Sequence, residues 1–310
     1  MRVLVTGAGG FVGNYLLPHL LDAGHEVVAT SLDVPRSAPV PWEALDLVDA
    51  PAVCRLVAST EPEGVIHLAA QASVGGSWTD PNQTYRINIE GTSNLLEVVK
   101  ELKPRMLMVG SAQQYARPAE GHVLTETDPQ AAGSPYALSK IAQEQMGRMY
   151  LKHYGVPSVF TRSFNHTGPG QSPQYAVGSF ASQIARLQVA GGGEMQVGNL
   201  DSRRDFLDVR DVVRAYMLLL EGGEAGEAYN VCSGRAVRLG DVLDKLLAVA
   251  GLKDRVEVHQ ETLHVSAAND LLVGDSTKVS TAVGWAPQIP LDDSLLSTLD
   301  WYRANLEGTR

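Results

Sequence analysis

The chain has 310 residues, enough for one large α/β domain with an elaboration or for two interlocked lobes. Its aromatic content of 6% argues against a protein that stacks on nucleic-acid bases, and its formal net charge of −10 leaves no general basic surface for DNA or RNA. Cys54 and Cys232 show no metal-ligand spacing, and no apolar run of about twenty residues occurs, so we expect a soluble, cytoplasmic protein that binds neither a metal nor a membrane.

Short apolar runs alternate with helical patterns through the first half of the chain. Apolar residues three and four apart predict helices, and short valine-rich runs between turn signals predict buried strands. Regular alternation of the two indicates a parallel sheet with helices on both faces. In chain order, we predict a strand at residues 2–6, a helix at 11–23, a strand at 26–30, a helix at 51–60, a strand at 64–69, a helix at 82–103, a strand at 105–110, a helix at 134–154 and a strand at 158–162.

A glycine-rich turn, T-G-A-G-G-F-V-G, joins the first strand to the first helix, with Gly7, Gly10 and Gly13 three residues apart. A dinucleotide loop needs a tight turn, a close backbone approach to the pyrophosphate and close helix–strand packing. The free N–H groups at the helix start, here at Phe11 and Val12, then bind the phosphate. A glycine-rich turn without a ligand is the alternative, but the position between a strand and an amphipathic helix favours a dinucleotide and a Rossmann-like, doubly wound parallel sheet.

The alternation ends after Phe164. Residues 165–175 are rich in Gly, Pro, Ser and Gln, which predicts an ordered loop at a site. We therefore predict a dinucleotide-binding domain at residues 1–164 and, at 165–310, a smaller lobe that mainly binds substrate and crosses back to the main sheet. The later patterns predict helices at 178–190 and 209–221, a strand at 229–232, and helices at 239–250 and 291–305.

The end of the second strand, A-T-S-L-D, bears on the choice of cofactor. An acidic residue there would bond the ribose hydroxyls of NAD(H), and an arginine would favour the 2′-phosphate of NADP(H). Ser31 and Leu32 take the expected place, Asp33 lies slightly beyond it, and Arg36 lies further on. Both cofactors stay open, with a lean towards NADP(H) because the acidic residue is absent from that place.

Tyr136 and Lys140 stand one helical turn apart in S-P-Y-A-L-S-K and share one helix face, after Ser111 at the end of a strand. A phenol can give a proton to a carbonyl oxygen, a nearby ammonium lowers the pKa of the phenol, and a serine hydroxyl can hold the same oxygen. A Tyr–Lys pair also occurs by accident on surface helices. Here it begins a helix, downstream of a dinucleotide loop, so we predict a carbonyl-reducing site of Ser111, Tyr136 and Lys140.

Together these motifs resemble the extended short-chain dehydrogenase/reductase family over essentially the whole chain. The resemblance implies that Ser111, Tyr136 and Lys140 are catalytic and that the last two also contact the nicotinamide side of the cofactor. It further implies cofactor contacts by residues of D-L-V-D and H-L-A-A, and support of the site by N-I-E-G-T. The residues concerned are Asp46, Leu47, Leu68, Ala69, Ala70 and Asn88.

Three segments of the second half are similar to bacterial GDP-4-keto-6-deoxy-D-mannose reductases and, less closely, to GDP-mannose 4,6-dehydratases. They are R-S-F-N-H-T-G-P-G-Q, V-G-N-L-D-S-R-R-D-F-L-D-V-R-D and Y-N-V-C-S-G. The resemblance implies substrate contacts by Asn165, Asn199 and Arg204, with the Arg204 guanidinium neutralising the diphosphate.

Several of these residues have a structural alternative. Asp46 is equally suited to cap a helix. We prefer to interpret His67 as a packed strand-end histidine with no catalytic role. An ion pair with Asp205 or Asp208 is the alternative for Arg204.

Position 113 helps to distinguish reaction types. In the dehydratases a Glu two residues after the catalytic Ser or Thr removes a proton beside the ketone, and in the related fucose-forming epimerase-reductases a Cys stands there. This chain has Gln113, in S-A-Q-Q-Y, and an amide cannot act as a general base near neutral pH. We therefore expect Gln113 to contact the substrate, and elimination and epimerisation are disfavoured.

One late segment departs from the dehydratases. Their R-P-x-E/D-V segment helps to hold the nucleotide, whereas the matching residues 265–275 read V-S-A-A-N-D-L-L-V-G-D and lack both the arginine and the acid. The nucleotide base of the substrate therefore stays open. Arg235 and Arg238 are candidates to compensate.

The expected function is the NAD(P)H-dependent reduction of the 4-keto group of a nucleotide-linked 6-deoxyhexose, GDP-4-keto-6-deoxy-D-mannose giving GDP-D-rhamnose. The family also implies a homodimer paired through the helices at 82–103 and 134–154. The alternatives are a GDP-mannose 4,6-dehydratase, a nucleotide-sugar 4-epimerase and a redox sensor that binds NADP without turnover. The intact Ser-Tyr-Lys set argues against the sensor.

Overall fold

The computed structural model describes residues 1–34, 40–260 and 271–306. Its main sheet, within these ranges, has seven strands in the order β10-β6-β5-β4-β1-β2-β3, and every neighbouring pair is parallel. The predicted parallel sheet is confirmed. The strands are β1 (Arg2–Thr6), β2 (Glu26–Ser31), β3 (Trp42–Ala44), β4 (Gly64–His67), β5 (Arg105–Ser111), β6 (Ser158–Ser163) and β10 (Ala228–Val231).

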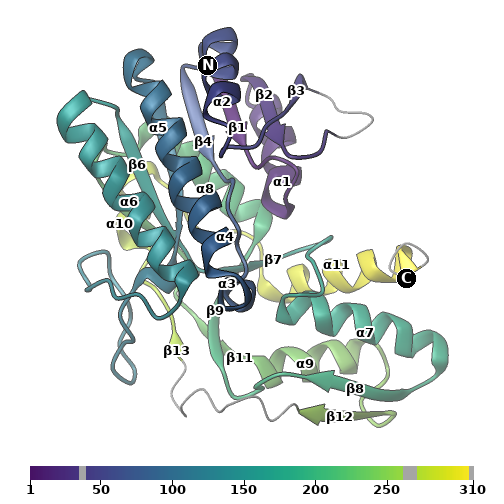
Figure 1. The fold of residues 1–310 in the computed structure, drawn as a ribbon. Coiled ribbons are helices and arrows are strands. Elements are labelled where there is room, and N and C mark those ends of the chain that lie inside the picture. The colour runs from purple at the N-terminus through teal and green to yellow at the C-terminus, as the bar shows by residue number, and fades with distance from the viewer. Residues whose placement is uncertain (35–39, 261–270, 307–310) are drawn as a thin grey trace.

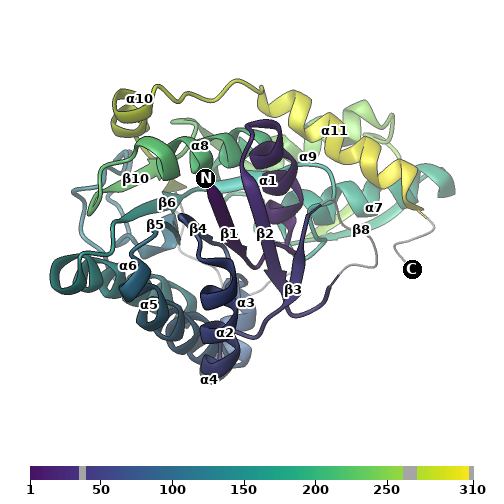
Figure 2. The ribbon, with the colours of Figure 1, turned by 90° about the horizontal axis from the view of Figure 1, so that it is seen from above.

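Helices cover both faces of this sheet (Figures 1 and 2). On one face α2 (Ala50–Thr60), α5 (Gly91–Leu102) and α6 (Pro135–Tyr154) pack over one apolar core. On the other face α1 (Phe11–Asp22) and α8 (Val209–Gly222) pack over a second core. The central strands are buried on both sides, which is why they read as continuous apolar runs, and the doubly wound α/β fold is confirmed.

The strand order reverses between β1 and β4. From β1 the chain proceeds outward to β2 and β3, and it then returns to β4 and proceeds the other way to β5, β6 and β10. All seven carboxyl ends lie at one edge, and a ligand of such a sheet binds at that edge, where the order reverses. The glycine turn follows β1, the H-L-A-A segment ends β4, and Ser111 ends β5.

A smaller lobe lies beside this edge (Figure 1). Its mixed sheet contains β7 (Asn165–Thr167), β9 (Arg203–Asp208), β11 (Ala236–Arg238) and β13 (Leu271–Leu272), and β8 (Gly193–Val197) pairs with β12 (Val256–Gln260). An apolar core joins β8, β9, β11 and β12 to three helices. The helices are α7 (Ala176–Ala190), α9 (Leu239–Val249) and α11 (Leu291–Ala304).

The second half differs from the prediction in its strands. The segment 165–175 is not entirely a loop, because its first three residues form β7 and pair with β9. The strands of the smaller lobe were not predicted, because they have only two to six residues and pair with distant segments. The chain also returns to the main sheet: β10 is its edge strand, and α10 (Thr277–Val283) packs on α8 and β10. The division at residue 164 stays a prediction.

The predicted helix at 82–103 is helical as far as Leu102 but not uniform. It consists of α4 (Pro81–Tyr85), a π-helical turn, η1 (Arg86–Glu90), and α5. Asp80 begins it, since its side chain accepts a hydrogen bond from Gln83 N. A separate short helix, α3 (Val74–Thr79), precedes it. None of the helices in the described ranges is both long and apolar enough to cross a bilayer.

Candidate active site

The glycine turn after β1 has room for glycine and for nothing larger at two positions. Gly7 has φ +70°, and a Cβ placed there would lie 2.5 Å from Ala69 Cα. A Cβ on Gly13 would lie 2.1 Å from the carbonyl oxygen of Ala8. The turn therefore draws the end of β4 against the end of β1 and seats α1 against the turn, as the dinucleotide-loop interpretation requires.

The start of α1 presents backbone donors at this edge. The intrahelical ladder begins with the bond from Asn14 N to Gly10 O, at 3.2 Å. The N–H groups of Phe11, Val12 and Gly13 therefore have no acceptor within the helix. The first turn carries no acidic side chain, so the positive end of the helix dipole is not neutralised there. These residues fit a diphosphate.

Ser31 lies beside the glycine turn. Its hydroxyl donates to the carbonyl oxygen of Asp33 and accepts from Trp42 Nε1 at 3.3 Å. A Cβ on Gly9 would lie 3.0 Å from Ser31 Oγ, which places this hydroxyl next to the phosphate-binding turn. Leu32 is exposed, and Arg36 lies outside the described residues.

Asp46 is not a helix cap. Its carboxylate accepts from Val48 N, whereas the N-cap of α2 is Asp49, which accepts from Ala52 N. Leu47 packs its side chain into the core under α5, so only its backbone can face a ligand. Asp46 itself is exposed.

His67 is a packed histidine, as preferred from the sequence. Its Nδ1 lies 2.7 Å from Thr6 Oγ1, and its Nε2 lies 2.8 Å from Thr92 Oγ1. Because Thr92 donates its hydroxyl hydrogen to the Asn88 carbonyl, His67 Nε2 carries the proton and Nδ1 accepts from Thr6. Burial, with the charge of Lys140 adding to it, lowers the pKa of His67 to about 3, so the ring is neutral at physiological pH.

Asn88, in the π-helical turn, ties two parts of the site together. Its Oδ1 accepts from Gln71 N at 2.8 Å, and its Nδ2 donates to Gln71 O at 3.1 Å and to Ser139 Oγ at 2.9 Å. Gln71 directly follows Leu68, Ala69 and Ala70, and Ser139 precedes Lys140. Since its side chain is fully buried, Asn88 acts on the site through these neighbours.

Ser111, Tyr136 and Lys140 lie together. Ser134 caps α6 by accepting from Ala137 N at 3.1 Å, which places Tyr136 in the first turn of the helix. The side chain of Ser111 lies close enough to the Tyr136 hydroxyl to act on the pKa of the phenol. Lys140 Nζ donates to the Val109 carbonyl at 2.9 Å and lies 6.0 Å from the centroid of the Tyr136 ring.

The protonation states at this trio differ from the prediction. Burial raises the pKa of Tyr136 to about 12, and the neighbouring Ser111 side chain only partly opposes the rise. Burial also lowers the pKa of Lys140 to about 7. The expected lowering of the phenol pKa by the ammonium is not seen in this geometry, because burial is the largest cause of the shift and Lys140 is not among its causes. Tyr136 carries its proton at neutral pH.

Ser111 is held by the short 3₁₀ turn that follows it, η2 (Ala112–Gln114). The Ser111 hydroxyl oxygen accepts from Gln113 N at 3.2 Å, and Ser111 N donates to Gln114 Oε1 at 2.8 Å. These two bonds fix the backbone and the hydroxyl at once. The side chain of Gln113 is half-buried two residues from Ser111.

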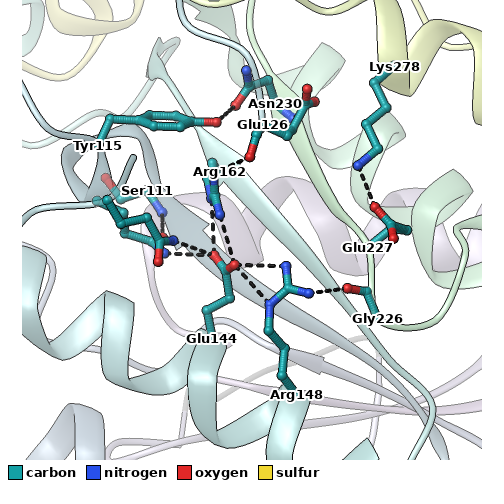
Figure 3. Close-up of polar contacts among 12 residues, drawn as sticks. Ser111, Tyr115, Glu126, Glu144, Arg148, Arg162, Gly226, Glu227, Asn230 and Lys278 are labelled. Atoms are coloured by element: carbon teal, nitrogen blue, oxygen red, sulfur yellow. Dashed lines mark hydrogen bonds and ion pairs between the residues drawn. The ribbon is translucent and has the colours of Figure 1, made fainter. Parts of the chain in front are cut away.

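Sequence reasoning missed a buried polar network behind Ser111 (Figure 3). Gln114 Nε2 donates to Glu144 Oε2 at 2.9 Å, and the guanidinium of Arg162 donates to both carboxylate oxygens of Glu144, at 3.1 and 2.9 Å. Two signals were present: Glu144 follows Lys140 by four residues on the same helix face, and Arg162 is a charged residue inside a predicted strand. Neither signal reveals which partner the charge has.

The predicted substrate residues lie in or beside the smaller lobe. Asn165 on β7 is paired with Phe206 on β9, two residues after Arg204, so Asn165 and Arg204 lie on one face of neighbouring strands. Arg204 is half-buried, and its Nη1 donates to Arg203 O at 3.0 Å. Asn199 instead lies in the turn after β8, where its side chain accepts from Asp201 N at 2.9 Å.

The charged neighbours of these residues have well-defined contacts. Asp208 pairs with Arg210, and Asp205 accepts from the backbone N–H groups of Ser233 and Gly234. Arg238 pairs with Asp201. In the segment that departs from the dehydratases, residues 265–270 lie outside the described residues, and β13 runs beside Arg203 and Arg204 on β9.

Comparison with known proteins agrees with this architecture. The model of the GDP-mannose 4,6 dehydratase family matches residues 4–298. A GDP-6-deoxy-D-mannose reductase of Pseudomonas aeruginosa is 36% identical over 313 residues, covering 97% of each chain. The structure of RMD from Pseudomonas aeruginosa complexed with NADPH has a TM-score of 0.84 at 32% identity and covers 98% of this chain and 99% of that one.

A structure of UDP-glucose 4-epimerase from Thermus thermophilus in complex with NAD has a TM-score of 0.85 at 31% identity. It covers 98% of this chain and 99% of that chain. The similarity thus extends over both the main sheet and the smaller lobe. The chain belongs to the GDP-mannose 4,6-dehydratase family of NAD(P)-dependent extended short-chain dehydrogenases/reductases, enzymes that modify nucleotide sugars.

Proposed function

We propose that this enzyme reduces the 4-keto group of GDP-4-keto-6-deoxy-D-mannose and forms GDP-D-rhamnose. The observation that carries the proposal is the protonated Tyr136 beside Ser111, with an amide at Gln113 where a proton-removing group would stand. A reductase needs an acid at the ketone oxygen and no base beside it. The 36% identical relative is named a GDP-6-deoxy-D-mannose reductase, which supports the same reaction.

The residues of the glycine turn fit a nicotinamide dinucleotide, whose bound nicotinamide supplies the hydride for the sugar C4. Gly7, Gly10 and Gly13 leave the backbone open to the diphosphate, and Phe11 and Val12 present their N–H groups to it. The segment Leu68–Ala70, Asp46 and the backbone of Leu47 would line the adenosine and nicotinamide ends. NADP(H) is proposed over NAD(H) because Ser31 ends β2 where an acidic reader of the ribose would stand.

The trio would act on the ketone oxygen as a unit. Ser111 and Tyr136, whose side chains lie beside each other, would both donate to O4, and Tyr136 would transfer its proton as negative charge develops there. Lys140 would hold the nicotinamide ribose and, in its charged form, stabilise the phenolate that remains. Asn165, Asn199 and Arg204 are proposed to bind the sugar and the diphosphate, with Gln113 beside the sugar.

Dehydration needs a group that this site lacks. A 4,6-dehydratase must remove a proton beside the ketone, and the amide of Gln113 cannot accept that proton near neutral pH. Some dehydratases and 4-epimerases are relatives of this chain, so both remain the second candidates. We also propose that the enzyme works as a cytoplasmic homodimer paired through α5 and α6.

A comparison of two substrates tests the proposed reaction. With GDP-4-keto-6-deoxy-D-mannose we expect stoichiometric NADPH oxidation and GDP-D-rhamnose, and with GDP-mannose alone we expect no product. Parallel assays with UDP- and dTDP-linked 4-keto-6-deoxy sugars identify the base. Formation of a 4-keto sugar from GDP-mannose would instead support the dehydratase.

The role of Tyr136 has its own test. Tyr136→Phe keeps the ring and removes the proton donor, so we expect turnover to fall by about 10²- to 10⁴-fold while NADPH still binds. Turnover is measured by NADPH absorbance and cofactor binding by fluorescence titration. An unchanged rate in the variant would show that another group protonates O4.

A further inference from the structure

The carboxylate of Glu144 is the centre of the buried network in Figure 3. Its residue is 4% exposed and lies on α6, which also carries Tyr136 and Lys140. Six N–H contacts reach its two oxygens, at 2.9 to 3.2 Å, and they come from Gln114, Gln130, Arg148 and Arg162.

Two of these contacts lead to the substrate side of the site. Gln114 joins Glu144 to Ser111, because its Nε2 donates to the carboxylate while its Oε1 accepts from Ser111 N at 2.8 Å. Arg162 approaches from β6, where it is paired in register with Gly110, the residue before Ser111. The end of β5 is therefore tied to α6 through one carboxylate.

The two oxygen-binding hydroxyls come from the two elements that this carboxylate joins. Ser111 ends β5, and Tyr136 begins α6. Their separation decides whether both can donate to one ketone oxygen, and a misplacement of about 1 Å in such a constellation can cost about 100-fold in rate. We propose that Glu144 is a positioning residue that sets the distance between the hydroxyls of Ser111 and Tyr136, an inference that rests on the proposed reduction.

The charge of Glu144 is part of this role. Burial raises the pKa of Glu144, but the hydrogen bonds and charges of Arg162 and Arg148 outweigh it and leave the pKa below its ordinary value, so the group is ionised. An amide in its place would present N–H groups to a buried guanidinium that needs an acceptor. A neutral side chain of the same size therefore cannot replace this carboxylate.

The network also fixes the segment between η2 and α6. Gln130 donates to Glu144 at 3.0 Å, and Arg162 Nη1 donates to the carbonyl of Glu126 at 3.0 Å. The Glu126 side chain accepts from Asn230 N on β10, at 2.7 Å. The carboxylate thus joins α6, β5, β6 and the segment that connects them.

Two variants test the proposal from both ends of the link. Gln114→Met keeps the shape and breaks the link to Ser111 while the Glu144–Arg162 pair remains, and Glu144→Gln removes the charge. The matched control is Asp211→Asn on α8, which loses a buried carboxylate that accepts from Gln288 N and Ile289 N and pairs with Arg214, on the opposite face of the sheet. Melting temperature, NADPH affinity, kcat and KM are measured for each protein.

We expect kcat of Gln114→Met to fall by about 10- to 100-fold, with KM and NADPH affinity within about threefold of wild type, because the nucleotide contacts lie elsewhere. Folded Glu144→Gln should show the same fall in kcat, with KM and NADPH affinity again close to those of wild type. Asp211→Asn should lose thermal stability and keep kcat. An unchanged kcat in folded Gln114→Met, with only a lower melting temperature, overturns the proposal.

A crystal structure of Gln114→Met separates this proposal from the proposed reaction. A longer distance from Ser111 Oγ to Tyr136 Oη than in wild type supports positioning, and an unchanged distance overturns it. This holds whichever keto-sugar the enzyme accepts. If wild type fails to turn over the GDP-linked substrate while the distance lengthens in the variant, the proposed substrate fails and the positioning role stands.

Discussion

The pKa values of Tyr136 and Lys140 are shifted in opposite directions, and burial causes both shifts. Burial penalises the charged form of each side chain, which raises the pKa of the phenol to about 12 and lowers that of the amine to about 7. The pair therefore begins a reduction with the phenol protonated. The amine titrates in the physiological range, which makes it the group through which pH acts on this site.

The perturbed pKa of Lys140 makes stability depend on pH. The pKa is about 7 in the folded chain against an ordinary value of 10.5, so between these values the unfolded chain binds the extra proton. The free energy of unfolding must therefore rise with pH from 7 towards 10.5. We expect wild type to gain about 3 kcal/mol relative to Lys140→Met between about pH 7 and pH 9.5, from urea unfolding at both values. Parallel pH dependences of the two proteins would contradict the low pKa.

At the scale of single residues, the sequence predicted which groups form the trio but not their electrostatics. The spacing of Tyr136 and Lys140 and the position of Ser111 at a strand end follow from chain order. The depth of burial, which decides both pKa values, depends on packing between elements. The partners of Glu144 could not be predicted for the same reason, because Gln114 lies in η2 and Arg162 lies on β6.

The π-helical turn η1 is the element that brings Asn88 to the site. It lies inside a helix whose periodic pattern gives no sign of a change in winding, so the sequence predicted the helix and not the turn. Single π turns are frequent at functional sites, and this one turns an amide inward to Gln71 and Ser139. The short strands of the smaller lobe escaped prediction because their pairing is entirely long-range.

Removing the Asn88 side chain should destabilise the protein. Asn88→Ala leaves the partly buried backbone N–H and carbonyl of Gln71 without the bonds from Asn88, so we expect the free energy of unfolding to fall by about 2–4 kcal/mol. Asn94→Ala is the matched control, because Asn94 is partly buried and holds chiefly the carbonyl of Leu47, and we expect a loss of about 1 kcal/mol. Equal losses in urea unfolding would show that the π turn has no special role.

At the scale of the whole molecule, α6 has an exposed, partly apolar surface that suits the proposed dimer. Leu138 and Met149 are 45% and 48% exposed on α6, and with Ala142 and Gln145 they form one stripe along the helix.

The parallel sheet and its helices were predictable because each βα unit is local in the chain. The exposed stripe on α6 could not be recognised from the sequence, because apolar residues of this helix face both the core and the solvent.

A charge in this stripe should separate the subunits. We expect wild type to have twice the mass of one chain by light scattering, and Met149→Glu to have the mass of a single chain, because a carboxylate would be buried without a partner. Val189→Glu, at a 78% exposed position on α7, is the control and should stay dimeric. A wild-type protein that is monomeric at micromolar concentration would refute the pairing.

The last strand of the main sheet, β10, enters it only after the chain has passed through the smaller lobe. A polypeptide ending at residue 164 would lack β10, which covers β6, and α8, which shields one face of the sheet. Such a truncation would leave a bare strand edge and an uncovered apolar face, the combination that drives self-association. During synthesis the nucleotide-binding half must therefore wait for the second half to emerge before its sheet is complete.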